Sequence, residues 1–417
     1  MLPKIAEVLE MPSSNREGWL TGLFNKVSST ESEYEIAVAF PTQCKNLPKV
    51  ICVDGIKCYP FYEKLDSPEN YDDNLEAELA VIIEEVKPDI LHIFGTEFPH
   101  SLAGARAFNN PKRTLVGIQG VCSKIAEDYM ALIPPYVVSR ATFRDRIRHD
   151  SIKRQQDKFF LRGESETKLL ELALNHTGRT TFDEEHTRMI NPSRNYYKMN
   201  ETMRPSFYDG RWSVDKIVPH TIFLGQGDYP IKGFHFLLEA LPEVVSQYPD
   251  VKVKIAGNSI INNSGIKDKI KISSYGAYLR ELVKKYNLES HIEVLGSLSE
   301  IRMKEAYLSS AVYVCPSYME NSPNTIAEAM LLGMPVIASN AGGIPDIISD
   351  NEGFVFKRGE SKALAELLCK VFDLEKNSLQ TIQKKCECAY ARAHKDYAPD
   401  ANLSKLFEIY DKIGRIC

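Results

Sequence analysis

The stretch from Val312 to Asp346, VYVCPSYMENSPNTIAEAMLLGMPVIASNAGGIPD, decides the fold of this chain. It predicts a buried strand, a loop that carries Glu320, a helix that carries Glu328, a second strand and a turn of two glycines. The amino end of such a helix offers N–H groups and positive dipole charge to an anion. Carboxylates accept hydrogen bonds from paired hydroxyls, as on a sugar ring. Together these features predict a site for a nucleotide-sugar.

The same stretch resembles the Glu-x7-Glu motif of retaining glycosyltransferases of family 4, which have the GT-B fold. Glu320 and Glu328 match the two glutamates of that motif, and PNTIAEAMLLGMPVIASNAGGIPD matches the family text that follows. The resemblance implies that Glu320 contacts the donor sugar and takes part in catalysis, and that Glu328 contacts the ribose. We expect Asn324 and Thr325, which precede Glu328 in the helix, to belong to the donor site as well.

A second donor segment, GQGDYPIKG, runs from Gly225 to Gly233 after a predicted strand. The family text at this place is G-R-x5-K-G, in which the arginine and the lysine clamp the leaving diphosphate. The resemblance therefore implies a catalytic and donor-binding role for Lys232, beside Gly233. Gln226 stands where the arginine would be, and losing a charged bidentate donor weakens diphosphate stabilisation by about 1–3 kcal/mol. Backbone contacts near Leu298 are expected to select the donor base.

Candidate residues in the first half follow predicted strands. Glu97 and His100 are expected at the edge of the cleft or in the acceptor site. Many family 4 members have a histidine where Gln119 stands, so the resemblance implies contact with the donor sugar near its reacting carbon; a glutamine cannot act as a base. Arg179 resembles a family position at the interdomain face, with a structural ion pair as the equal alternative. Gly18 allows close backbone approach to a phosphate or an acceptor.

Composition places the chain among globular proteins of two domains. It has 417 residues, of which 43% are hydrophobic, and a net charge of −5, which argues against a general nucleic-acid binder. No run of 18 or more apolar residues occurs, and the amino terminus lacks the pattern of a signal peptide. The nine scattered cysteines are typical of a reducing compartment, so we expect a cytoplasmic protein.

The order of strands and helices predicts a doubly wound α/β fold. Short apolar runs without polar alternation indicate parallel strands buried on both faces; in the second half they lie at 220–225, 251–257, 291–296, 311–315, 335–339 and 353–356. The first half gives similar, weaker signals. With the resemblance, this predicts a GT-B fold: two Rossmann-like domains facing a central cleft. We expect an acceptor domain at 1–205, a nucleotide-sugar domain at 206–397, and a helix at 398–417 that crosses back to the first domain.

The amino terminus departs from the family pattern. A doubly wound domain usually opens with an apolar strand, whereas Lys4–Glu10 reads as a helical turn. Family members carry a strand just ahead of Asn15–Trp19, the segment that contains Gly18. We therefore expect the first sheet to lack a central member.

No cofactor or metal is expected. The patterns H-E-x-x-H, C-x-x-C, Walker A and D-x-D do not occur, and Cys386 and Cys388 have no second pair to complete a zinc site. Residues 136–162 hold eight Lys or Arg against three Asp, interleaved with aromatic residues. This pattern suits docking to an anionic membrane face or to the diphosphate of a lipid-linked acceptor, and a solvated helical face is the alternative.

The sequence predicts a retaining, metal-independent hexosyltransferase. It would move a sugar from a UDP- or GDP-sugar to a hydroxyl of a glycan or of a polyprenyl-diphosphate-linked acceptor. The expected setting is synthesis of a surface polysaccharide, such as capsule or O-antigen, at the inner face of the membrane. Two alternatives remain open: a catalytically weak binding subunit that partners a true transferase, and a nucleotide-sugar epimerase.

Overall fold

The computed structural model describes residues 1–12, 18–257, 261, 270–373 and 376–415. The chain forms two compact units. The first comprises Met1–Ser123, Lys158–Arg204 and Tyr397–Cys417, and the second Lys124–Asp157 and Pro205–Asp396. This division differs from the expected one in residues 124–157, which group with the second unit although they precede the expected boundary. The acceptor and donor roles of the two domains stay predictions.

The described strands of the second unit form a six-stranded sheet in the order β10-β9-β8-β11-β12-β13, with all neighbours parallel. Its central strands are buried along their whole length, which explains why the sequence shows apolar runs without alternation. The strands are β8 (Thr221–Leu224), β9 (Lys252–Ala256), β10 (Ile292–Gly296), β11 (Val312–Cys315), β12 (Val336–Ser339) and β13 (Phe354–Phe356). The doubly wound prediction is confirmed for this unit.

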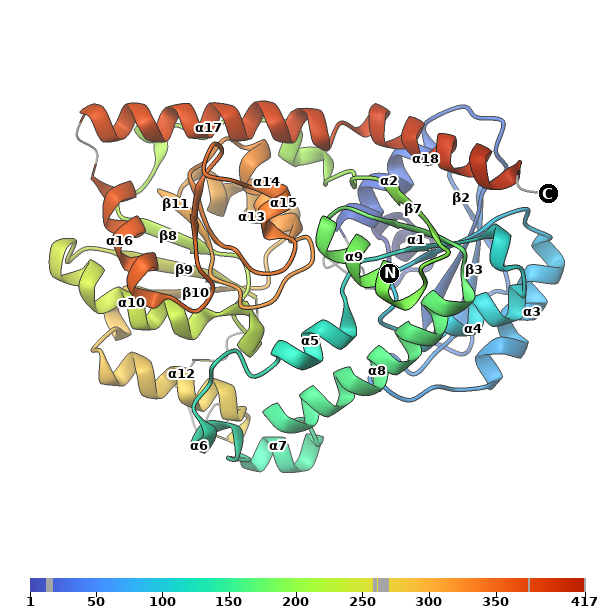
Figure 1. The fold of residues 1–417 in the computed structure, drawn as a ribbon, viewed down its shortest axis with the longest axis horizontal. Helices are drawn as coiled ribbons and strands as arrows, with labels where there is room; N and C mark the ends of the chain where they lie inside the picture. Colours follow the sequence, from blue (N-terminus) through green and yellow to red (C-terminus); the bar gives the residue numbers. More distant parts are fainter. Residues whose placement is uncertain (13–17, 258–260, 262–269, 374–375, 416–417) are drawn as a thin grey trace. The chain divides into compact units, whose positions relative to one another are not determined.

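Helices cover both faces of this sheet (Figure 1). The helices of this unit are α6 (Pro135–Val138), α7 (Phe143–Arg148), α10 (Phe234–Gln247), α12 (Ser274–Lys285), α13 (Glu300–Leu308), α14 (Asn324–Leu331), α15 (Ile344–Ile347), α16 (Ser361–Phe372) and α17 (Lys376–Asp396). Helix α10 packs against α12 and α16, whereas α14 packs against α17. Short 3-10 turns lie at Pro205–Tyr208, Val214–Lys216, Pro230–Lys232 and Glu289–His291.

The first unit carries its strands in two sheets, with orders β1-β3-β2 and β4-β5-β6-β7. All neighbours are parallel except the β2–β3 pair. The strands are β1 (Ala37–Thr42), β2 (Ile51–Val53), β3 (Ile56–Tyr62), β4 (Leu91–Phe94), β5 (Thr114–Gly117), β6 (Asn175–Gly178) and β7 (Asn195–Lys198). A helix, and not a strand, occupies the start of the described chain, as the sequence predicted for Lys4–Glu10.

The helices of the first unit are α1 (Pro3–Val8), α2 (Gly18–Ser28), α3 (Asn74–Val86), α4 (Pro99–Phe108), α9 (Thr181–Ile190) and α18 (Pro399–Gly414), with a 3-10 turn at Pro111–Arg113. Helices α5 (Cys122–Asp128) and α8 (Ile152–Leu172) run from one unit into the other along the chain. Apolar clusters form the core: one joins α1 and α2 to the β1-β3-β2 sheet, another joins β3 to α3 and α4, and a third joins β5 to α18.

The last helix, α18, belongs to the first unit although α17 before it belongs to the second. Ile409 and Ile413 of α18 pack on Leu115 of β5, and all three side chains are fully buried. The ring of Phe407 also stacks on Tyr34, with centroids 4.6 Å apart. These contacts confirm that the carboxy-terminal helix returns to the first unit.

Residues 124–157 join the second unit through buried polar contacts. His235 of α10 bonds through Nε2 to the carbonyl oxygen of Ala131 (2.9 Å) and through Nδ1 to the hydroxyl of Tyr275 (3.1 Å). Burial lowers the pKa of His235 to about 4, so the ring is neutral at pH 7. These contacts were not visible in the sequence, because the partners lie 104 and 40 residues apart.

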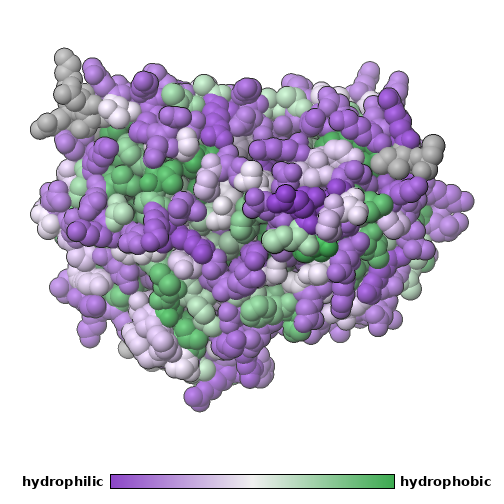
Figure 2. Space-filling model, in the orientation of Figure 1, coloured by the Kyte–Doolittle hydropathy of each residue, from purple (hydrophilic) through white to green (hydrophobic). Residues whose placement is uncertain are grey.

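The side of the molecule drawn in Figure 2 carries both hydrophilic and apolar side chains on its surface. Among the described residues, no helix is both long enough and apolar enough to cross a membrane.

Replacing Ile409 with Ala should lower the free energy of unfolding of the first unit by about 2–5 kcal/mol, because it leaves a cavity between α18 and β5. Trp19 lies in the first unit and Trp212 in the second, and the chain has no other tryptophan. Urea unfolding followed by the fluorescence of Trp19, in a Trp212→Phe background, measures the effect. Glu408→Ala, on the exposed side of the same helix, is the control. Equal unfolding midpoints for the two variants would contradict the packing role of α18.

Candidate functional site

Two loops meet at the side of the six-stranded sheet where its strands have their carboxyl ends. One follows β8 and carries Lys232, and the other follows its neighbour β11 and carries Glu320. Lys232 Nζ donates to Glu320 Oε1 (2.7 Å), and Ser317 Oγ donates to the same oxygen (2.9 Å). The backbone joins the loops too, since the N–H of Tyr318 donates to the carbonyl oxygen of Ile231 (2.7 Å). Ligands of doubly wound sheets bind at this edge.

Two glycines permit this close approach. Gly233 has a φ of +71°, and a Cβ there would collide with the carbonyl oxygen of Pro316. Gly342 has a φ of +50°, and a Cβ there would collide with the carbonyl oxygen of Glu320. The next residue, Gly343, donates its N–H to that same oxygen (3.1 Å). The two-glycine turn after β12 therefore fixes the position of Glu320.

Lys232 stays charged in this place. Burial on its own would lower the pKa of Lys232, but the neighbouring Glu320 carboxylate attracts and hydrogen-bonds the ammonium, and the pKa is raised above its ordinary value. The pair is thus a cation and a carboxylate held side by side at the sheet edge. Such a pair can offer positive charge to a phosphate and acceptor oxygens to hydroxyls.

Glu328 lies on α14 and is buried. The hydroxyl of Tyr307, on α13, donates to Glu328 Oε2 (3.3 Å) and approaches the carbonyl oxygen of Thr325 (3.1 Å). Gly225, at the end of β8, lies so close to Thr325 that a Cβ there would be 3.2 Å from Thr325 Cγ2. The start of α14, the end of β8 and the loop of Lys232 are therefore neighbours.

The three other predicted donor residues lie on the same unit and differ in exposure. Gln226 follows Gly225 and is exposed, Asn324 is the first residue of α14 and half-buried, and Leu298 lies half-buried between β10 and α13. No groups of three or more His, Cys, Asp or Glu side chains suited to a metal ion occur within the described ranges.

A second cluster lies in the first unit, where β5 and β6 end. Arg179, one residue past β6, forms a buried ion pair with Glu201 (2.6 Å) and approaches Gln119 Oε1 through Nη2 (3.3 Å). Removing one member of a buried pair leaves the other charge uncompensated and costs about 3–5 kcal/mol. Arg179 is therefore a structural ion-pair residue that also holds Gln119.

Glu97, three residues after the end of β4, stabilises the turn that carries Gln119. Its carboxylate accepts the N–H of Gly120 (2.6 Å) and of Thr96 (2.9 Å). Burial raises the pKa of Glu97, although the hydrogen bond from Gly120 opposes the shift. The Glu97 carboxylate therefore fixes the turn formed by Ile118, Gln119 and Gly120. This turn sets the position of Gln119.

The other two candidates of the first unit, His100 and Gly18, contact residues other than Gln119. His100 Nδ1 is 2.7 Å from Glu63 Oε2, and the ring stacks on Phe98. Gly18 begins α2, and a Cβ there would collide with the side chain of Arg204. Of the loop predicted at Asn15–Trp19, residues 15–17 lie outside the described residues.

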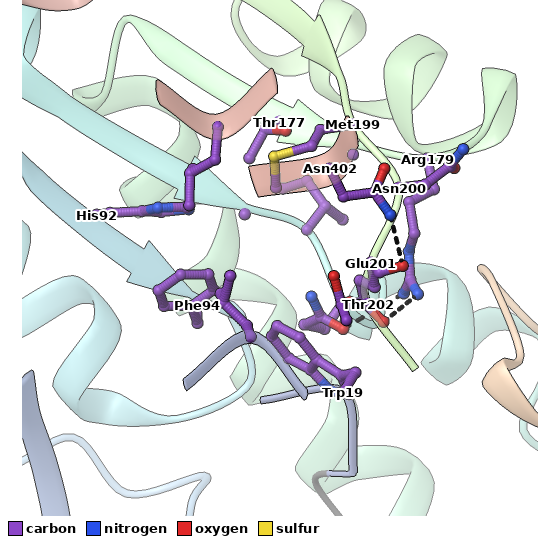
Figure 3. A pocket seen from close by; sticks show the side chains of 16 residues that line it. Trp19, His92, Phe94, Thr177, Arg179, Met199, Asn200, Glu201, Thr202 and Asn402 are labelled. Atoms are coloured by element: carbon purple, nitrogen blue, oxygen red, sulfur yellow. Dashed lines mark hydrogen bonds and ion pairs between the residues drawn. The ribbon is translucent and has the colours of Figure 1, made fainter. Parts of the chain in front are cut away.

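A cavity opens beside Gln119 and Arg179 (Figure 3). Trp19 and Phe94 line one side, and Met199 and Asn402 lie on the other. His92 closes one end, where its Nδ1 meets the hydroxyl of Tyr410 (2.9 Å), and burial lowers the pKa of His92 to about 3. A mostly apolar hollow with a few polar groups is a common form of small-molecule site.

Sequence reasoning missed Glu201, Ser317, Tyr307 and Trp19. Ser317 stands inside the deciding stretch, three residues before Glu320, and that spacing was the available signal. Glu201 lies in an aperiodic segment, so nothing in the sequence pointed to its pairing with Arg179.

Comparisons with known proteins relate part of the chain to one family. Residues 215–387 match the family of glycosyl transferases group 1. The chain is 28% identical over 195 residues to a phosphatidyl-myo-inositol mannosyltransferase of Mycobacterium leprae (46% of each chain). It is 26% identical over 161 residues to the putative colanic acid biosynthesis glycosyltransferase WcaL of Escherichia coli, covering 37% of this chain and 36% of that one. The chain thus aligns with less than half the length of these curated relatives.

Solved structures share the whole fold. Sucrose-phosphate synthase from Thermosynechococcus elongatus matches with a TM-score of 0.68 at 16% identity, covering 96% of this chain and 94% of that one. Anabaena Alr3699/HepE, solved with UDP-glucose, matches with a TM-score of 0.60 at 17% identity, covering 86% and 87%. These likenesses confirm the GT-B fold.

Replacing Gly342 with Ala should destabilise the second unit by about 3 kcal/mol or more, because neither the new Cβ nor the Glu320 carbonyl can move away cheaply. Gly55→Ala is the matched control: Gly55 also has a positive φ (+83°), but a Cβ there meets nothing within 4 Å. Backbone strain alone, about 1–2 kcal/mol, is expected for the control. Urea unfolding, read from Trp212 for Gly342→Ala and from Trp19 for Gly55→Ala, compares them. Equal losses would show that the contact with Glu320 does not constrain the loop.

Proposed function

We propose that this chain, whose residues 215–387 belong to the glycosyl transferases group 1, moves a sugar from a nucleotide-sugar to an acceptor hydroxyl. The observation that carries the proposal is the Lys232–Glu320 pair beside the amino end of α14. A cation and a helix amino end together suit a diphosphate, and the carboxylates of Glu320 and Glu328 suit the hydroxyls of a sugar and a ribose.

The resting contacts suggest how a donor would bind. Without a donor, Lys232 and Glu320 compensate each other's charge. Phosphate oxygens arriving at Lys232 would take over that ammonium, and the Glu320 carboxylate would then accept hydrogen bonds from the sugar. Glu328, braced by Tyr307, would accept from the ribose hydroxyls. Asn324 and Thr325 would lie beside the phosphates, at the positive end of the α14 dipole.

We further propose a retaining reaction by front-face substitution. The bond between the anomeric carbon and the diphosphate oxygen breaks, and a bond to the acceptor oxygen forms on the same face. The acceptor proton passes to the leaving diphosphate, which Lys232 and the helix amides stabilise without a metal. Gln119, held by Arg179 and by the turn that Glu97 ties, would hydrogen-bond the sugar near the reacting carbon.

For the substrates, we propose a UDP- or GDP-hexose and a hydroxyl on a glycan or on a lipid-linked acceptor bound by the first unit. The UDP-glucose complex of the Anabaena protein supports a uridine donor. The names of the mannosyltransferase and of WcaL support a lipid or surface-polysaccharide acceptor. Capsule or O-antigen synthesis at the cytoplasmic face of the membrane would be the setting.

Two alternatives compete with catalysis by this chain. Gln226 and Gln119 replace residues that family members use, which favours a binding subunit of low activity that partners a true transferase. A nucleotide-sugar epimerase is the other alternative. Analysis of products separates the three, since a transferase gives a glycosylated acceptor, an epimerase gives an epimeric nucleotide-sugar without an acceptor, and a binding subunit gives neither.

Binding of one nucleotide family should stabilise the wild type and not Glu328→Ala. A donor at about 100 times its dissociation constant adds about 2.7 kcal/mol, which raises the melting temperature by several degrees. A thermal-shift screen of UDP, GDP, ADP and their sugar conjugates measures this. Glu366→Ala removes an exposed glutamate of α16 in the same unit and should respond like the wild type. An unaltered shift in Glu328→Ala would remove Glu328 from the donor site.

Gln226→Arg should raise the rate of sugar transfer about tenfold or more, because a guanidinium adds a charged, bidentate donor for the leaving diphosphate. Gln226 is exposed, so the longer side chain has room. Steady-state kinetics with the donor found by thermal shift test the prediction, and Gln226→Met is the neutral control. An unchanged or lower rate in Gln226→Arg would mean that position 226 does not face the diphosphate.

A further inference from the structure

One side of helix α7 is hydrogen-bonded to other parts of the second unit. Thr142 and Asp145 form a capping box at its start, with the N–H of Asp145 on Thr142 Oγ1 (3.2 Å) and the N–H of Thr142 on Asp145 Oδ2 (3.1 Å). The carboxylate of Asp145 is buried and also accepts the N–H of Ser274 (2.9 Å), at the start of α12. Thr142 Oγ1 donates to the carbonyl oxygen of Ile272 (2.7 Å). This short helix is therefore held in a fixed orientation.

The other side of α7 presents apolar side chains to solvent. Phe143 and Ile147 are 65% and 62% exposed, and their spacing of four residues places them on one helical face. Tyr136 on α6 is 60% exposed. Among the described residues only six large apolar side chains are at least 60% exposed, so three on adjoining short helices are a concentration. Figure 1 draws α6 and α7 close together near the bottom of the view.

Basic side chains surround these apolar ones. Arg146 lies three residues from Phe143 on the same face, and Arg148 follows Ile147. No ion pair of either arginine is found among the described residues. The nearby acids are already compensated: Asp150 by Arg144 (2.9 Å), and Glu281 by Arg140. The α6–α7 face, defined as the exposed side chains of Tyr136, Phe143, Arg146 and Ile147 with Arg148 at its edge, is therefore apolar and cationic.

We infer that the α6–α7 face docks on an anionic lipid bilayer. Apolar rings and chains would enter the interface, while the arginines reach phosphate groups at headgroup level. Five side chains on two short helices are few beside the roughly 20–30 residues per partner of a stable protein interface, whereas interfacial insertion needs no such number. The inference does not depend on the proposed sugar transfer.

The structure also narrows the segment that the sequence suggested, 136–162. Its second half has other partners: Lys158 pairs with Glu69 (3.0 Å), and Arg162 donates to the carbonyl oxygen of Glu97 (2.9 Å). Arg162 also lies over the ring of Phe159, 4.4 Å from its centroid. These residues make their contacts within the first unit, so we assign the contact with the membrane to residues 136–148.

The test is sedimentation of the full chain with vesicles of phosphatidylcholine, with or without roughly a third of phosphatidylglycerol. Wild-type protein should bind the anionic vesicles, and less at high salt. Phe143→Ser with Ile147→Ser should weaken binding about tenfold, and Arg146→Glu with Arg148→Glu about twentyfold or more. Val81→Ser with Met189→Ser, which removes two equally exposed apolar side chains elsewhere, is the matched control and should bind like the wild type.

Absence of binding by folded wild type, or equal binding to both kinds of vesicle, would overturn the inference. Equal binding by all variants would overturn it as well, since the contact would then lie elsewhere. Light scattering adds one more outcome. A dimer that dissociates in Phe143→Ser with Ile147→Ser would assign the face to a second copy of the chain instead. Melting temperatures equal to that of the wild type establish that the variants are folded.

Discussion

The contact between Lys232 and Glu320 is the constraint on which the candidate site depends. It joins the loops after β8 and β11, which are neighbours because those strands pair at the centre of the sheet. The loops can approach only because Gly233 and Gly342 lack side chains, and the two-glycine turn then fixes Glu320 from the β12 side. A charged lysine and a carboxylate are thereby held at the sheet edge where nucleotides bind in doubly wound folds.

The first unit places its polar groups by a different device. Carboxylates fix the residues around Gln119: Glu97 accepts the N–H of Gly120, and the buried Glu201 pairs with Arg179, which reaches Gln119. Helix α18 completes this unit by covering β5 with Ile409 and Ile413. Because the carboxy terminus of the chain stabilises the amino-terminal unit, loss of α18 would disturb the candidate acceptor side, although it lies far from Gln119 in sequence.

Much of the second unit could be predicted from the sequence, and less of the first. Strands such as β8 and β11 are buried on both faces and therefore read as unbroken apolar runs. β6, with the sequence Asn-His-Thr-Gly, is equally buried but polar, because its side chains bond to neighbouring backbone, as Asn175 does to Lys112. Such a strand has no apolar signature. Lys232 and Glu320 were each assigned to the donor site from family motifs, whereas their contact with each other and the Arg179–Glu201 pair depend on tertiary packing. The split of the first unit into two sheets likewise left no direct mark on the sequence.

The most direct test of the account is a crystal structure of the protein with the nucleoside diphosphate that it binds. The account predicts phosphate oxygens within hydrogen-bonding distance of Lys232 Nζ and of the N–H groups of Asn324 and Thr325, with ribose hydroxyls at Glu328. The Lys232–Glu320 hydrogen bond should lengthen as the phosphates take the ammonium. A nucleotide bound with full occupancy elsewhere, with the Lys232–Glu320 pair unchanged, would contradict the assignment of the donor site.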